Sequence, residues 1–109
     1  MSPLFERQVD KLREGHFLVL YWVARAEDTG HAYNITNAFD DLKAQGITRT
    51  KQTAVAMIEA LDALDFLRLQ GQGNRKHLLI TEDGARALER LVHKGAFQPR
   101  RSSFLEAQS

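Results

Sequence analysis

The chain contains no cysteine and only two prolines. Without cysteine there can be no disulfide, no thiolate metal site and no cysteine nucleophile. Long hydrophobic runs are also missing: the longest, Phe17 to Ala24, is far shorter than the roughly 20 apolar residues of a membrane-spanning helix. The first residues do not resemble a signal peptide. We therefore expect a cytoplasmic protein that does not enter a membrane.

Side chains that could assemble a metal or catalytic centre are scattered along the chain. The four histidines form no i, i+4 pair of the kind that binds zinc. The adjacent acids Asp40 and Asp41 point in different directions on a helix, so we expect both to be solvated. No Ser-His-Asp arrangement has suitable spacing. We expect no metal, no cofactor and no enzymatic activity.

The 109 residues, 43% hydrophobic and 27% charged, suit one globular domain. Helical spacing of apolar residues covers positions 3–15, 16–26, 32–44, 51–64 and 82–94, whereas 66–70 and 75–80 alternate as strands. This order predicts a mainly α fold with a small β-hairpin, the winged helix-turn-helix. We expect an N-terminal helix in 1–15, the winged helix-turn-helix domain in 16–95 and a disordered basic and polar tail in 96–109.

The start of the helix predicted at 51–64 is rich in hydroxyl, amide and cationic side chains. In a helix-turn-helix, the N-terminal residues of the second helix face the major groove of DNA. Cations and hydroxyls there can bind phosphates, Gln52 and Thr53 can contact base edges, and the small Ala56 lets the helix lie deep. A helix that is merely capped and soluble would need only Thr50. The predicted DNA-binding residues are Thr48, Arg49, Thr50, Lys51, Gln52, Thr53 and Ala56.

The turn of the predicted hairpin combines glycines with cations. A glycine-rich tip can approach another backbone closely. Asn74, Arg75 and Lys76 beside it suit phosphates or a narrow minor groove. Turn geometry alone also explains the glycines and the asparagine.

Two apolar clusters have open roles. The N-terminal stripe can contact either a second subunit or its own domain; it consists of Phe5, Val9 and Leu12. The aromatic cluster could line a ligand cavity at a dimer interface, although core packing is favoured. Its members are Phe17, Tyr21 and Trp22.

Three segments resemble motifs of the PadR family of winged-helix regulators and, more loosely, of the MarR family. Residues 30–35 (GHAYNI) are similar to Gly-Tyr-Glu-Ile with a two-residue spacer, and residues 61–67 (LDALDFL) to Leu-Glu-x-x-Gly-Leu-Ile. Residues 75–84 (RKHLLITEDG) look like the wing strand that leads into Leu-Thr-x-x-Gly. Where the family has a glycine after its recognition helix this chain has Asp65, which can adopt the left-handed conformation at a cost.

The resemblance covers about residues 17–91 and implies a homodimeric transcriptional regulator that binds double-stranded DNA. Helix 51–64 would read the major groove, and the wing at 68–79 would touch the backbone or the minor groove. Some family members bind small aromatic effectors, so the resemblance also implies a small aromatic molecule as a candidate ligand.

Two other functions stay open. The net charge of only +1 favours a winged helix that contacts proteins and not DNA. Glu59, Asp62 and Asp65 favour it too, because these acids would repel phosphates and should stay off DNA. A small enzyme or accessory subunit is the other alternative, and the lack of a catalytic cluster argues against it.

Overall fold

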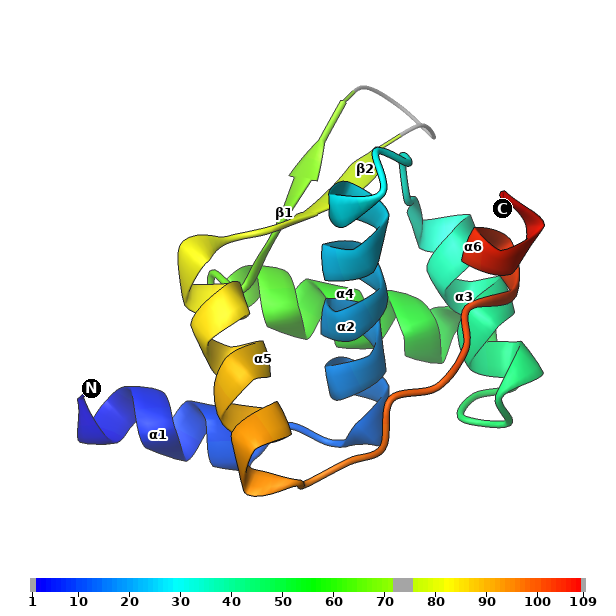
Figure 1. Cartoon of the computed structure of the whole chain (residues 1–109). Coiled ribbons are helices and arrows are strands. Elements are labelled where there is room, and N and C mark those ends of the chain that lie inside the picture. Colours follow the sequence, from blue (N-terminus) through cyan, green and yellow to red (C-terminus); the bar gives the residue numbers. More distant parts are fainter. Residues whose placement is uncertain (1, 72–75, 109) are drawn as a thin grey trace.

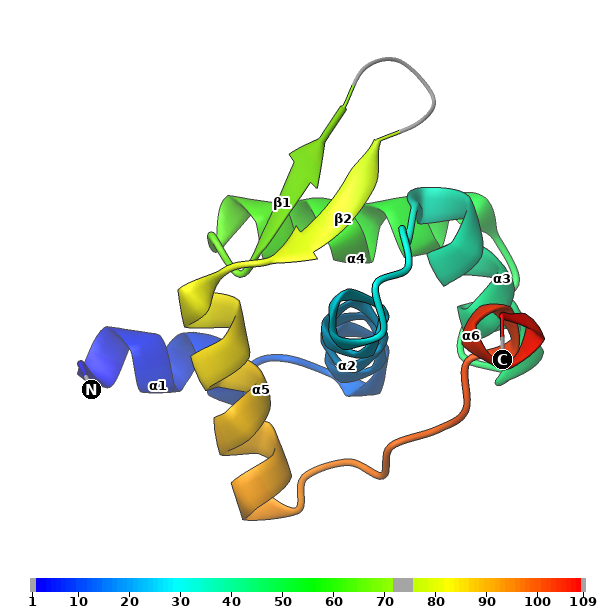
Figure 2. The same cartoon turned by 45° about the horizontal axis from the view of Figure 1, so that its top comes forward.

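Helix α2 (Glu14–Asp28) runs through the centre of the molecule, and Figure 2 shows it end-on with the other elements around it. The computed structural model describes residues 2–71 and 76–108. The remaining helices are α1 (Pro3–Asp10), α3 (Ile35–Ala44), α4 (Lys51–Ala63), α5 (Glu82–Lys94) and α6 (Ser103–Ala107), and the strands are β1 (Leu67–Gln70) and β2 (His77–Ile80) (Figure 1). The mainly helical fold with one small hairpin confirms the coarse prediction. None of the helices in the described ranges is long and apolar enough to cross a membrane.

The apolar sequence of α2 matches its central position. The helix contacts α3, α4, α5 and β2, so nearly every side of it is covered. Its fully buried side chains are Phe17, Leu18, Val19, Leu20, Trp22, Val23 and Ala26. α2 begins at Glu14 and not at residue 16, and the backbone amide of Arg13 donates to Nδ1 of His16 at 3.0 Å at this end.

α3 and α4 are joined by a short turn and pack against each other. Asn34 and Asn37 exchange side-chain to backbone hydrogen bonds of 2.8 and 3.0 Å, which fixes the start of α3 at Ile35 and leaves residues 32–34 outside the helix. Gly46, with φ of +72°, ends this segment as glycine does at a helix C-terminus. α4 begins after Thr50 as predicted and ends one residue earlier than predicted.

The hairpin connects α4 to α5. Its strands are antiparallel, with Leu67 opposite Ile80 and Gln70 opposite His77. The amide of Leu78 also donates to the carbonyl of Tyr33 at 2.7 Å, so β2 is tied to the segment before α3. Asp65 adopts a φ of +66° between α4 and β1, the left-handed conformation that aspartate can take at a cost.

The apolar stripe of α1 packs on the chain's own domain. Val9 is fully buried and Leu12 is 7% exposed, and the ring of Phe5 meets that of Phe66 edge-on at 5.7 Å. Asp10 binds Lys94 at 2.6 Å, which joins α1 to α5. Val9 and Leu12 therefore pack inside their own domain, whereas Phe5 is half-buried, and contact of the stripe with a second subunit stays a prediction.

The C-terminal segment is folded back onto the helices, which corrects the prediction of a disordered tail. From Gly95 it crosses the molecule and ends in α6, which contacts α3 (Figure 1). The indole Nε1 of Trp22 donates to the carbonyl of Arg100 at 2.8 Å, and the side-chain Nε2 of Gln45 donates to the carbonyl of Arg101 at 3.0 Å. These contacts bridge positions far apart in the chain, so local composition does not reveal them.

Candidate nucleic-acid interface

The N-terminal end of α4 is capped and lies at the surface. The side chain of Thr50 accepts from the backbone amide of Thr53 at 3.3 Å, and the two threonine hydroxyls are 2.9 Å apart. Thr50 and Thr53 are both exposed. The free amides of a helix N-terminus carry partial positive charge, so this end favours an anion.

The polar residues predicted around this end are mostly free of other contacts. Arg49, Gln52 and Ala56 are exposed, and the side chains of Arg49 and Gln52 make no hydrogen bond or ion pair with any described residue. Lys51 is also exposed, and its Nζ lies 3.4 Å from the hydroxyl of Thr36 on α3. The structure therefore brings these side chains together on one open surface, which we call the α4 tip (Arg49 to Thr53).

Thr48 differs from the other predicted contact residues. It is only 8% exposed. Its hydroxyl donates to the carbonyl of Thr50 at 3.2 Å and accepts from the Thr50 amide at 3.3 Å. The prediction that this hydroxyl faces phosphates is therefore corrected: Thr48 shapes the turn that presents the α4 tip.

The predicted hairpin contacts are described only in part. Lys76 is exposed at the start of the returning strand. Asn74 and Arg75 lie outside the described residues. Arg68 is exposed on β1, opposite Leu79, and adds a cation that sequence reasoning did not single out. The alternation of β1 could have revealed it, since Arg68 lies between the apolar residues Leu67 and Leu69.

The other end of α4 is acidic. Glu59 and Asp62 are exposed along the helix, and Asp65 is exposed just after it. The described helix has no acid in its first turn and no base in its last. Its charges therefore run from cationic at the start to anionic at the end, which limits any phosphate contact to the first turns.

A buried carboxylate that the sequence did not reveal holds the C-terminal segment. Asp41 is 1% exposed, and it accepts hydrogen bonds from the Tyr33 hydroxyl at 2.6 Å, from the Ser102 hydroxyl and from the Phe104 amide at 3.1 Å. Burial, together with the Asp41 carboxylate, raises the pKa of Tyr33 well above its usual value, so the phenol stays a donor. The expectation that Asp41 is solvated is wrong because its partner Ser102 lies 61 positions away.

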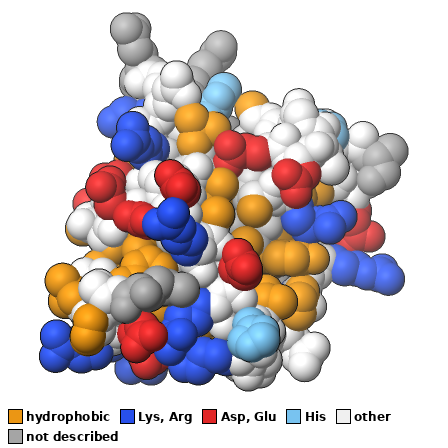
Figure 3. Space-filling view, turned by 60° about the vertical axis from the view of Figure 1, so that its left-hand side comes forward, with side chains coloured by type: hydrophobic (Ala, Val, Ile, Leu, Met, Phe, Trp, Pro, Cys, Tyr) orange, Lys and Arg blue, Asp and Glu red, His pale blue; other side chains and the backbone are white. Residues whose placement is uncertain are grey.

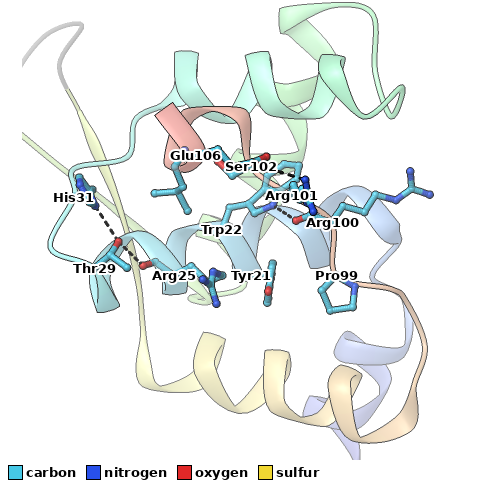
Figure 4. A pocket seen from close by; sticks show the side chains of 11 residues that line it. Tyr21, Trp22, Arg25, Thr29, His31, Pro99, Arg100, Arg101, Ser102 and Glu106 are labelled. Atoms are coloured by element: carbon cyan, nitrogen blue, oxygen red, sulfur yellow. Dashed lines mark hydrogen bonds and ion pairs between the residues drawn. The ribbon is translucent and has the colours of Figure 1, made fainter. Parts of the chain in front are cut away.

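An open groove lies between α2 and the C-terminal segment (Figure 4). Its volume is about 710 Å³, and Tyr21 and Trp22 belong to its walls. Phe17, the other member of the aromatic cluster, is fully buried in the core. The aromatic cluster therefore packs in the core, which is the role that the sequence favoured. Two of its members, Tyr21 and Trp22, also border this groove.

Among residues 2–71 and 76–108, no three histidine or acidic side chains are grouped so that they could hold a metal ion. Comparison of the chain with protein families, curated proteins and solved structures finds no match.

Proposed function

We propose that this protein is a winged helix-turn-helix regulator of transcription that binds double-stranded DNA. In this proposal α3 and α4 form the helix-turn-helix, α4 enters the major groove, and the hairpin lies on the backbone or in the minor groove. The observation that carries it is the exposure of the α4 tip, which no described residue of the hairpin or of the C-terminal segment covers. A tip buried by the chain's own elements could not enter a groove.

The charges of α4 give independent support. Cations at a helix start and acids at its end both oppose the helix dipole, at a cost of about 0.3–1 kcal/mol each for surface positions. Arg49 and Lys51 at the start and Asp62 near the end have this unfavourable arrangement. Stability therefore does not explain the cations, whereas a phosphate docked at the tip would use both the cations and the free amides.

Each tip residue has a specific role in the proposal. Arg49 and Lys51 bind phosphates, which positions α4 without reading sequence. Gln52 and Thr53 face base edges, where glutamine can pair with adenine and the threonine methyl can touch that of thymine. The small Ala56, one turn further along, allows close approach. At the hairpin, Lys76 acts on the backbone together with Asn74 and Arg75.

The motifs shared with PadR-type regulators support a cytoplasmic homodimer. Two copies would present their α4 helices to half-sites about one helical turn of DNA apart. Val9 and Leu12 do not supply the interface, because both are buried within one chain.

A second candidate function is a winged helix that binds only proteins. The exposed acids Glu59 and Asp62 favour it, because they would be repelled by phosphates if α4 lay deep in a groove along its whole length. A stable protein partner and no retention on DNA at low salt would select this function.

The test is a mobility-shift titration with the variants Arg49→Ala and Lys51→Ala at several salt concentrations. Each variant should weaken binding to all duplexes and lower the slope of log K against log salt by around one unit, the effect of one lost phosphate contact. Arg7→Ala removes an exposed cation on α1 and is the matched control. Unchanged affinity in both tip variants would contradict this placement of the DNA-binding surface.

A further inference from the structure

The groove between α2 and the C-terminal segment has fixed walls. The bond from Trp22 to the Arg100 carbonyl and the bonds from Ser102 and Phe104 to Asp41 hold the C-terminal wall. Figure 4 shows Tyr21, Arg25 and Pro99 on the side of α2 that faces α5, with Thr29 and His31 at one end. Trp22 on α2 and Asp41 on α3 hold the C-terminal segment from two different helices. The shape of the groove is therefore fixed by the fold.

The dimensions and lining of the groove suit a small molecule. About 710 Å³ falls within the range of roughly 300–1,000 Å³ typical of small-ligand sites. Its lining combines apolar and polar residues. Tyr21, Trp22, Pro99 and Leu105 contribute the apolar part.

The charges of the groove favour an anion. It is lined by the cations Arg25, Arg100 and Arg101 and by one acid, Glu106. Arg100 pairs with Glu14 at 3.4 Å and Arg101 with Glu106 at 3.8 Å. Arg25 has no carboxylate partner among the described residues; its exposed guanidinium lies 5.8 Å from the centre of the Tyr21 ring.

We propose that this groove binds a small organic anion with an apolar body. The guanidinium of Arg25 binds the anionic head through charge-assisted hydrogen bonds, and the half-buried ring of Tyr21 packs against the body. The site lies within a single chain, so it requires no second subunit. It also stands independently of DNA binding, since none of its lining residues belongs to the α4 tip.

The test uses two fluorescent probes of similar shape and different charge, 8-anilinonaphthalene-1-sulfonate and the neutral N-phenyl-1-naphthylamine. The sulfonate should bind the intact chain with one-to-one stoichiometry and more tightly than the neutral probe. Arg25→Gln should weaken sulfonate binding roughly tenfold and leave the neutral probe unaffected. The sulfonate affinity of Arg25→Lys should lie between those of the native chain and Arg25→Gln, because lysine keeps the positive charge but lacks the planar guanidinium group.

Arg7→Gln, which removes an exposed cation on α1, is the matched control and should bind both probes as the native chain does. Trp22 is the single tryptophan, so its indole N–H gives one unambiguous NMR signal beside the groove. That signal should shift as the sulfonate binds. No sulfonate binding, equal losses in the Arg25→Gln and Arg7→Gln variants, or an unmoved indole signal would each overturn the proposal.

Discussion

Asp41 shows how one side chain can connect distant parts of a small protein. Its carboxylate lies on α3, accepts from Tyr33 just before that helix and binds two groups of the C-terminal segment. A buried carboxylate is costly unless its oxygens are hydrogen-bonded, and here three donors meet that need. Asp41 therefore anchors the C-terminal segment together with the hydrogen bonds from Trp22 and Gln45.

Asp41→Asn should lower the free energy of unfolding by about 3 kcal/mol, because the amide nitrogen would face donors and the charged acceptor would be lost. Urea unfolding measures the change. The matched control is the neighbouring, exposed Asp40→Asn, which should change stability by less than about 0.5 kcal/mol. Equal effects of the two variants would show that Asp41 does not anchor the segment.

His16 predicts a dependence of stability on pH. Burial of the ring, and secondly the charge of Arg13, lowers the pKa of His16. Below about pH 6.5 the unfolded chain takes up a proton that the native ring resists, so stability is lost as pH falls toward the lowered native pKa. Above that pH the residue contributes no pH dependence.

Unfolding titrations of the native chain and of His16→Gln between pH 7.5 and about 5 test this sign. The variant should lose less stability than the native chain as pH falls. His93→Gln removes an exposed imidazole on α5 and serves as the control. Parallel curves for the native chain and His16→Gln would rule out the assignment.

Among the elements, those fixed by local chemistry were predictable from sequence. α4 and α5 have regular apolar stripes, a threonine cap at the start and no competing signal. The exposed residues of the α4 tip were predictable for the same reason, since they lie on either side of that cap. The C-terminal segment and the groove were not, because they depend on contacts such as Trp22 with Arg100, 78 positions apart.

The start of α5 requires a threonine and, three residues later, a glycine, which are Thr81 and Gly84. Thr81 accepts from the Gly84 amide at 2.9 Å, and its own amide donates to the carbonyl of Phe66 at 3.2 Å. A Cβ on Gly84 would lie 1.9 Å from that carbonyl oxygen. The first turn of α5 can therefore pack this closely on Phe66 only because residue 84 is a glycine.

Gly84→Ala should destabilise the fold by about 2–3 kcal/mol, because backbone and not a flexible side chain blocks the new methyl group. Thermal or urea unfolding measures this loss. The control Ala85→Ser changes an exposed position one residue further and should be nearly neutral. A fully stable Gly84→Ala variant would mean that α5 and the hairpin are further apart than described.

At the scale of the whole molecule, the α4 tip differs from the rest of the surface in how its charged side chains are paired. Figure 3 shows the face near α1 and α5, where acidic and basic side chains alternate with small apolar patches. Charges on α5 pair with each other, as Arg86 does with Glu82 at 3.0 Å, and within residues 2–71 and 76–108 the exposed large apolar residues are Leu4 and Val92. The α4 tip is different, because its Arg49 has no such partner among the described residues.

The most direct measurement of the central claim is selection of bound sequences from a pool of random duplex DNA. The intact protein should enrich one preferred site, with two half-sites if it binds as a dimer. Gln52→Ala should select a more relaxed version of that site, because it removes a base contact and leaves the phosphate contacts in place. Failure to retain any duplex at low salt, or retention of all sequences equally, would contradict sequence-specific DNA binding by the α4 tip.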